Sequence, residues 1–159
     1  MKITILAVGK VKEKFYREAI GEFGKRLGRY CRLEFVEVAD EQTPDCASAA
    51  KERQIKEKEG QRILKHVREG DWVCALAIEG NMLDSIALSK KIDSLGIGGA
   101  SHLVFVIGGS LGLSAKVLER ADFLLSFSKM TFPHQLMRVI LLEQIYRSYR
   151  ILKGEPYHK

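Results

Sequence analysis

A glycine-rich run is the clearest candidate for a ligand-binding loop in this sequence. It spans Ile107–Gly112 (IGGSLG) and directly follows the apolar stretch 103–107. Ligands of open α/β sheets bind beyond the carboxyl ends of strands, where glycines let backbone amide groups come close. Two other predicted strands end near Gly80 and Phe127. We expect the loops after these three strands to form one pocket, although the glycine run alone is equally typical of a tight turn.

The carboxyl-terminal segment holds the side chains best suited to proton transfer. The tail Tyr157–Lys159 has His158 at its centre, and His134 lies at the start of the last predicted helix. Both histidines have a structural alternative, because terminal side chains are usually disordered and a histidine at a helix start is often a capping or packing residue. Glu143 and Arg147 have the spacing of an i,i+4 helix pair.

Several common catalytic and metal-binding patterns are absent. The chain has no Walker A loop, no HExxH zinc helix and no GxSxG nucleophile elbow. The turn Gly9–Lys12 does not fit a dinucleotide-binding fingerprint. Three widely spaced cysteines, Cys31, Cys46 and Cys74, fit neither a zinc site nor a secreted disulfide framework. We expect reduced thiols and no bound metal.

The apolar pattern predicts alternating strands and helices that would position these loops. Continuous apolar runs predict buried strands, and apolar residues at helical spacing predict helices. The expected strands are 3–8, 33–38, 72–78, 103–107 and 123–127, and the expected helices are 15–27, 47–68, 85–95, 115–120 and 133–152. Strands that are apolar on both faces indicate a sheet covered on both sides. We predict a single three-layer α/β domain over residues 1–159, with about five mostly parallel strands.

Composition and charge narrow the class of protein further. The chain has 159 residues, 46% of them hydrophobic, which suffices for one buried core. No run approaches the roughly 20 apolar residues of a membrane span, so we expect no membrane partner and a cytoplasmic protein. The net charge is +6; residues 1–33 hold nine basic and three acidic groups, and residues 138–159 hold five and two. Such clustering is typical of phosphate-backbone binding or of a solvated helix face.

The last predicted helix indicates a homodimer. Six of the seven residues in Leu136–Leu142 are apolar, and Arg138 is the exception. A helix that is apolar nearly all round must be covered on more than one side, and a sheet of about five strands covers only one. A second copy of the chain is the simplest additional cover.

Several motifs occur together and in order. They are Ile107–Gly112, Ser128–Gln135 (SKMTFPHQ), Glu143–Arg147 (EQIYR) and Pro156–His158 (PYH). In this combination the sequence resembles the ribosomal RNA large subunit methyltransferase H family of the SPOUT superfamily, over essentially its whole length. The resemblance implies an α/β-knot fold with a carboxyl-terminal trefoil knot, a homodimer, and S-adenosylmethionine bound in the knot. The implied reaction is methylation of N3 of a pseudouridine in 23S rRNA, on assembled ribosomes.

The resemblance also implies which residues bind the cofactor. These are Leu76, Gly108 and the loop made of Phe127, Ser128, Lys129, Met130, Thr131 and Phe132. Many relatives are expected to carry an acidic pair after the leucine, whereas this chain has Ala77 and Ile78. We therefore expect only a backbone contact at Leu76.

The same resemblance gives the tail a role in the reaction. N3 of the base is an imide, which must lose a proton or have its developing negative charge stabilised. His158 is suited to take that proton, and Tyr157 to stack on the base or hydrogen-bond to it. Arg138 and Lys159 are cations that could bind phosphate or favour the anionic base.

Three other functions are compatible with parts of the sequence. A non-catalytic RNA-binding module would explain the basic ends and predicts no saturable S-adenosylmethionine binding. A dinucleotide-dependent oxidoreductase would use the glycine loop, but the turn after the first strand argues against it. A SPOUT enzyme acting on tRNA would share the fold and the cofactor, and differs only in substrate.

Overall fold

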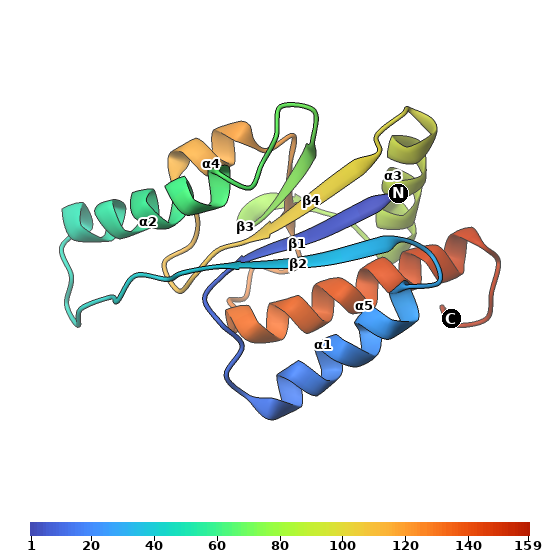
Figure 1. The fold of residues 1–159 in the computed structure, drawn as a ribbon, viewed down its shortest axis with the longest axis horizontal. Coiled ribbons are helices and arrows are strands. Elements are labelled where there is room, and N and C mark those ends of the chain that lie inside the picture. The colour runs from blue at the N-terminus through green and yellow to red at the C-terminus, as the bar shows by residue number, and fades with distance from the viewer.

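Five parallel strands form one sheet at the centre of the molecule (Figure 1). The computed structural model describes residues 1–159. The strands are β1 (Lys2–Val8), β2 (Arg32–Val38), β3 (Trp72–Met82), β4 (His102–Ile107) and β5 (Phe123–Ser126), in the order β2-β1-β4-β3-β5. Every pairing is parallel, which confirms the predicted sheet.

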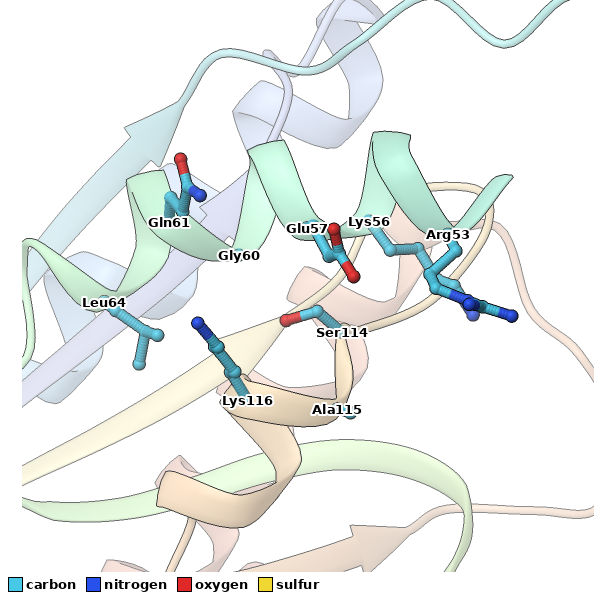
Figure 2. A pocket seen from close by; sticks show the side chains of 9 residues that line it. All are labelled: Arg53, Lys56, Glu57, Gly60, Gln61, Leu64, Ser114, Ala115 and Lys116. Atoms are coloured by element: carbon cyan, nitrogen blue, oxygen red, sulfur yellow. The ribbon is translucent and has the colours of Figure 1, made fainter. Parts of the chain in front are cut away.

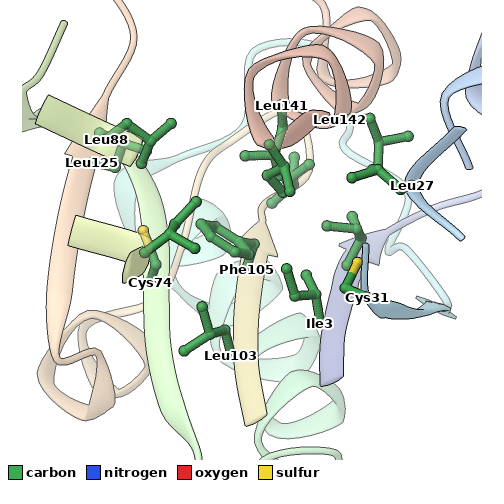
Figure 3. Close-up of a cluster of buried hydrophobic side chains, with 14 of the residues drawn as sticks. Ile3, Leu27, Cys31, Cys74, Leu88, Leu103, Phe105, Leu125, Leu141 and Leu142 are labelled. Atoms are coloured by element: carbon green, nitrogen blue, oxygen red, sulfur yellow. The ribbon is translucent and has the colours of Figure 1, made fainter. Parts of the chain in front are cut away.

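Helices cover both faces of this sheet and complete the three layers (Figure 1). One face carries α1 (Lys14–Leu27), α3 (Ser85–Ile97) and α5 (His134–Leu152), and the other carries α2 (Ala49–Leu64) and α4 (Ala115–Arg120). The larger hydrophobic core lies under the first group and centres on Phe105 (Figure 3). The smaller core lies under α2 and α4 and includes Ile63 and Val117. The three-layer prediction is therefore confirmed.

Element boundaries differ from the prediction at three places. Helix α2 is shorter than the predicted 47–68, because Ser48 caps its start by accepting a hydrogen bond from the Lys51 N–H at 3.1 Å. Strand β3 continues to Met82 instead of ending near residue 78. Helix α5 begins at His134, and Pro133 is the non-helical N-cap residue before it rather than its first helical residue.

Helix α5 lies between α1 and α3 and packs against both. Its residues Leu141, Leu142 and Ile145 are completely buried. Leu136 and Ile140 remain half-buried within the single chain. Helices α1 and α3 thus bury part of the apolar surface of α5 that we expected a second copy of the chain to bury.

Candidate functional site

The three predicted loops follow three adjacent strands. Strand β3 lies between β4 and β5, and all three run in the same direction. Their carboxyl ends therefore meet at one edge of the sheet, which we call the carboxyl edge. The segments 108–114, 83–84 and 127–133, which follow these strands, all begin at this edge, and β3 has a bulge at residues 77–80 just before it. The three strands thus end at one edge as predicted, but the cavity found there is lined by residues near the ends of β3 and β5 and by no residue of the glycine loop.

The glycine loop after β4 is a tight turn whose backbone is open to a ligand. Gly112 donates its N–H to the carbonyl of Gly109 at 3.1 Å and has φ of +89°. A Cβ at Gly108 would lie 2.9 Å from the carbonyl carbon of Gly112, so a side chain there would force the turn apart. The N–H groups of Ser110 and Leu111 donate no hydrogen bond within the chain. Such free donors suit a small polar ligand recognised through the backbone.

The glycine loop rests on a buried carboxylate that the sequence did not indicate. Glu59 of α2 is 4% exposed, and its Oε2 accepts the Glu41 N–H at 3.0 Å. A Cβ at Gly109 would lie 3.3 Å from each of its carboxylate oxygens. Burial raises the pKa of Glu59, and the nearby Asp40 adds to this effect. Glu59 therefore packs closely under the loop, and any side chain at position 109 would have to displace it.

The other two loops are shaped by one close backbone approach and one turn. Strand β3 leaves its register with β5 between Leu76 and Asn81, so that residues 77–80 bulge out. Gly80 makes this possible, because a Cβ there would lie 2.7 Å from the carbonyl of Leu124. In the loop after β5, the Ser128 hydroxyl accepts the Met130 N–H at 3.0 Å. Leu76 thus lies at the start of a bulge that packs against β5 at Leu124.

A cavity of about 310 Å³ touches this part of the carboxyl edge. It includes Phe127 of the predicted cofactor loop, and its wall is partly apolar with a few polar groups. The lining residues are Leu83, Asp84, Ser85, Leu88, Leu125, Ser126, Phe127, Ile140 and Gln144. A second cavity, of about 340 Å³, lies between α2 and α4 and contains none of the predicted site residues.

Arg138 lies in a different environment from the one predicted for a substrate-binding cation. Its side chain is 4% exposed, and Nη1 donates to Glu37 at 2.6 Å. Its Nη2 donates to the carbonyls of Val8 and Gly9, at 3.1 and 2.8 Å. A guanidinium buried and engaged in this way is closed to a substrate phosphate. Arg138 instead fastens α5 to the end of β1.

The tail is held by one carboxylate and one guanidinium of α5. Arg147 donates two hydrogen bonds to Glu143 Oε1, at 2.9 and 2.6 Å, which is the helix pair expected from the spacing. Glu143 Oε1 also accepts the Tyr157 hydroxyl at 3.1 Å, and Arg147 Nη1 lies 3.1 Å from His158 Nδ1. Burial and the Glu143 charge both raise the pKa of Tyr157. Lys159 is exposed beyond this cluster.

The tail lies far from the carboxyl edge of its own chain. The Tyr30 hydroxyl, just before β2, donates to Glu155 at 2.6 Å, and Arg150 also contacts Glu155. This places the tail at the amino ends of the strands. Helix α5 has 19 residues, and at ~1.5 Å per residue it is roughly 28 Å long. Figure 1 shows the chain end at one end of α5 and the carboxyl edge at the other.

The remaining candidate groups have structural surroundings. Burial raises the pKa of Cys31 to about 11 and of Cys74 to about 12, as expected of packing thiols. His102 lies 2.7 Å from Asp71 Oδ1 and 2.8 Å from the Thr4 hydroxyl. No cluster of three or more histidine, cysteine or acidic side chains could hold a metal ion. None of the five helices combines the length and apolar character needed to cross a membrane.

Comparison with known proteins gives full-length matches. Residues 1–158 match the family described as "Predicted SPOUT methyltransferase". A Bifidobacterium adolescentis protein named "Ribosomal RNA large subunit methyltransferase H" is 67% identical over 159 residues, which are 100% of both chains. Proteins of the same name from Clostridium tetani and Clostridium kluyveri are 62% and 58% identical, again over 100% of both chains.

Proposed function

The chain belongs to the SPOUT methyltransferase family, and from this premise we propose that it methylates N3 of a pseudouridine in 23S rRNA with S-adenosylmethionine as donor. Support for an rRNA substrate comes from the full-length relatives, whose names specify the large-subunit RNA. The family also implies a trefoil knot in the carboxyl-terminal part of the chain. Such a substrate would place the protein in the cytoplasm.

The observation that carries this proposal is the glycine loop, whose Ser110 and Leu111 N–H groups are free, at the edge where two adjacent strands also end. Leu76, Gly108 and the loop 127–132 would hold S-adenosylmethionine, mainly through main-chain groups and apolar walls. When bound, this cofactor supplies an activated methyl group on a cationic sulfur. The residues fit such a ligand, because the turn at Gly108 excludes side chains and leaves N–H donors free. The missing acidic pair after Leu76 does not affect a backbone contact.

We assign the catalytic step at the nucleobase to the tail. Arg147 can only donate a hydrogen bond, so Nδ1 of His158 accepts in the observed contact. A neutral ring then carries its proton on Nε2, which can donate to a carbonyl oxygen of the base and stabilise its anion. For His158 to accept the N3 proton through Nδ1, the Arg147 contact must break. Tyr157 would stack on the base, and Lys159 would contact a nearby phosphate.

The position of the tail supports an active site shared between two chains. The tail lies at the opposite end of α5 from the loops of its own chain. We propose a homodimer in which the tail of each protomer completes the pocket of its partner. The half-buried Leu136 and Ile140 on α5 are the surface expected to join the two copies.

Methyl transfer to defined RNAs tests the substrate. Large ribosomal subunits, free 23S rRNA and tRNA should be incubated with labelled S-adenosylmethionine, and the modified nucleoside identified. We expect 3-methylpseudouridine in 23S rRNA, formed on assembled subunits. A product only in tRNA would indicate another SPOUT substrate. Saturable RNA binding, together with calorimetry that detects no cofactor binding at millimolar S-adenosylmethionine, would favour the non-catalytic module.

A further inference from the structure

A hollow lies between α2 and α4, and none of the predicted cofactor-binding residues lines it. We propose that this hollow, which we call the α2–α4 groove, binds the phosphodiester backbone of the rRNA substrate beside the target nucleotide. The proposal rests on the proposed function, since it assigns a second contact for the same RNA. Its lining residues come from one side of α2 and the start of α4 (Figure 2).

The lining of the groove is mainly polar and cationic. Arg53 and Lys56 extend from α2 on the side of the groove, and Lys116 extends from α4 toward α2 (Figure 2). Glu57 is the one acidic group in the lining. The other lining residues are Gly60, Gln61, Leu64, Ser114 and Ala115, of which only Leu64 and Ala115 are apolar. This composition suits a polyanion better than an apolar peptide.

The cations of the groove are not neutralised within the chain. No carboxylate lies within 4 Å of the charged groups of Arg53, Lys56 and Lys116. By contrast, Arg62 of α2 pairs with Glu41, and Arg120 of α4 pairs with Asp122. Free cations around a hollow can neutralise phosphates and release their counterions, which is the main source of affinity for a nucleic-acid backbone. The paired arginines thus hold parts of the chain together, whereas the unpaired cations of the groove are available to a ligand.

The groove lies close to the glycine loop, because its lining residue Ser114 comes two residues after Gly112. Helix α4 begins three residues after Gly112, so the loop and one wall of the groove belong to the same short segment. A Cβ at Gly60 would lie 2.3 Å from the Ser114 hydroxyl oxygen, which shows how closely the two helices approach. The preceding residue, Glu59, supports Gly109. An RNA strand with its base at the carboxyl edge could therefore continue along this groove.

Charge reversal tests the groove directly. The variant Lys56→Glu/Lys116→Glu should be compared with Lys51→Glu/Lys58→Glu, which changes the net charge equally on exposed α2 residues outside the groove. For the groove variant we expect kcat/KM for large subunits to fall about tenfold or more. The slope of log KM against log salt concentration should also decrease by about one to two. Calorimetry should give an unchanged Kd for S-adenosylmethionine, which also shows that the variant is folded.

The outcomes separate the two proposals. A wild-type chain that methylates no rRNA would contradict the proposed function itself. If the wild type methylates rRNA and the groove variant keeps its KM and salt slope, the groove proposal is wrong. An equal loss in both variants would also overturn it, because the RNA would then follow the whole outer surface of α2. Should the groove variant fail to bind S-adenosylmethionine, the single change Lys116→Gln carries the test with the same readouts.

Discussion

The two edges of the sheet are structured by different chemical groups, backbone at one and charged side chains at the other. At the carboxyl edge, Gly108 and Gly80 allow close backbone approaches, and the N–H groups of Ser110 and Leu111 are left free. At the amino edge, charged side chains are joined in a chain of contacts: Lys2 to Glu34 at 2.6 Å, Thr4 to Glu34 at 3.2 Å, and His102 to Thr4 and Asp71. The tail is fixed at this second edge, through Tyr30 and Glu155.

The difference indicates that the two edges serve different parts of the proposed reaction. Backbone shape suits a cofactor that is the same in every reaction, whereas side chains with defined hydrogen bonds suit proton chemistry at a nucleobase. Because the loops and the tail lie at opposite ends of α5 (Figure 1), one chain alone does not bring them together. Each edge should therefore fail in its own way when it is changed.

The strongest effect is expected from His158→Ala. Loss of the group that handles the developing charge should lower kcat about 100-fold or more. The Kd for S-adenosylmethionine should not change, because the loops are assigned to the cofactor and His158 to the nucleobase. Single-turnover methyl transfer and calorimetry measure the two quantities. An unchanged kcat would remove His158 from the mechanism, and a weakened Kd would show that the two edges are coupled.

Mixing two inactive variants tests whether the edges of different chains cooperate. Gly108→Val should block the cofactor pocket, and His158→Ala should disable the tail. Co-refolded in equal amounts, they should regain about a quarter of the wild-type activity, since half of the dimers are mixed and each mixed dimer has one intact pair of edges. No recovery, although mixed dimers are present, would mean that the tail serves its own chain.

A smaller effect is expected from Gly108→Ala. Its Cβ would approach the Gly112 backbone to 2.9 Å and displace the turn, so the Kd for S-adenosylmethionine should rise about tenfold, or ~1.4 kcal/mol. Gly21→Ala on α1 is the matched control, because a Cβ there meets nothing within 4 Å. Calorimetry on both variants measures the change. Equal Kd values would contradict the role of this turn.

The smallest effect on activity is expected at Asp71. Burial alone would raise its pKa, but hydrogen bonds from the Arg68 N–H and His102 together hold the pKa below the ordinary 3.8. The ionised form therefore stabilises the fold, and this contribution is lost as the pH falls below about 4. Asp71→Asn should lower the unfolding free energy by about 1–3 kcal/mol at neutral pH and flatten its acid dependence. Denaturant unfolding at several pH values measures this; an unchanged profile would contradict it.

Most of the fold follows from local sequence pattern. The apolar runs predicted all five strands, because a parallel sheet covered on both faces needs strands that are apolar on both sides. The strand order and the length of β3 did not follow. Gly80 and Asn81 looked like a strand end, but the absence of a side chain at Gly80 lets the chain bulge and pair again with β5.

The sequence indicated the parts of the candidate site that depend on backbone conformation. It did not indicate the side chains whose role depends on being buried. Glycines after strands indicated the loops, and the resemblance supplied the tail. Glu59 lies in a charge-rich segment typical of a solvated helix, and only the packing of α2 under Gly109 buries it. Arg138 likewise gave no sign of its contacts, because its partners Glu37 and Val8 are more than 100 residues away in sequence.

The missing side chain at Gly60 limits how this protein can evolve. Any other residue would place a Cβ 2.3 Å from the Ser114 hydroxyl oxygen, and Ser114 in turn caps α4 by accepting the Val117 N–H. Exposed charges of α2 outside the groove, such as Lys51 and Lys58, can change one at a time, whereas a side chain at position 60 requires Ser114 to shift or to change with it. Adapting the groove to a differently shaped RNA by moving these two helices would therefore require changes at both positions.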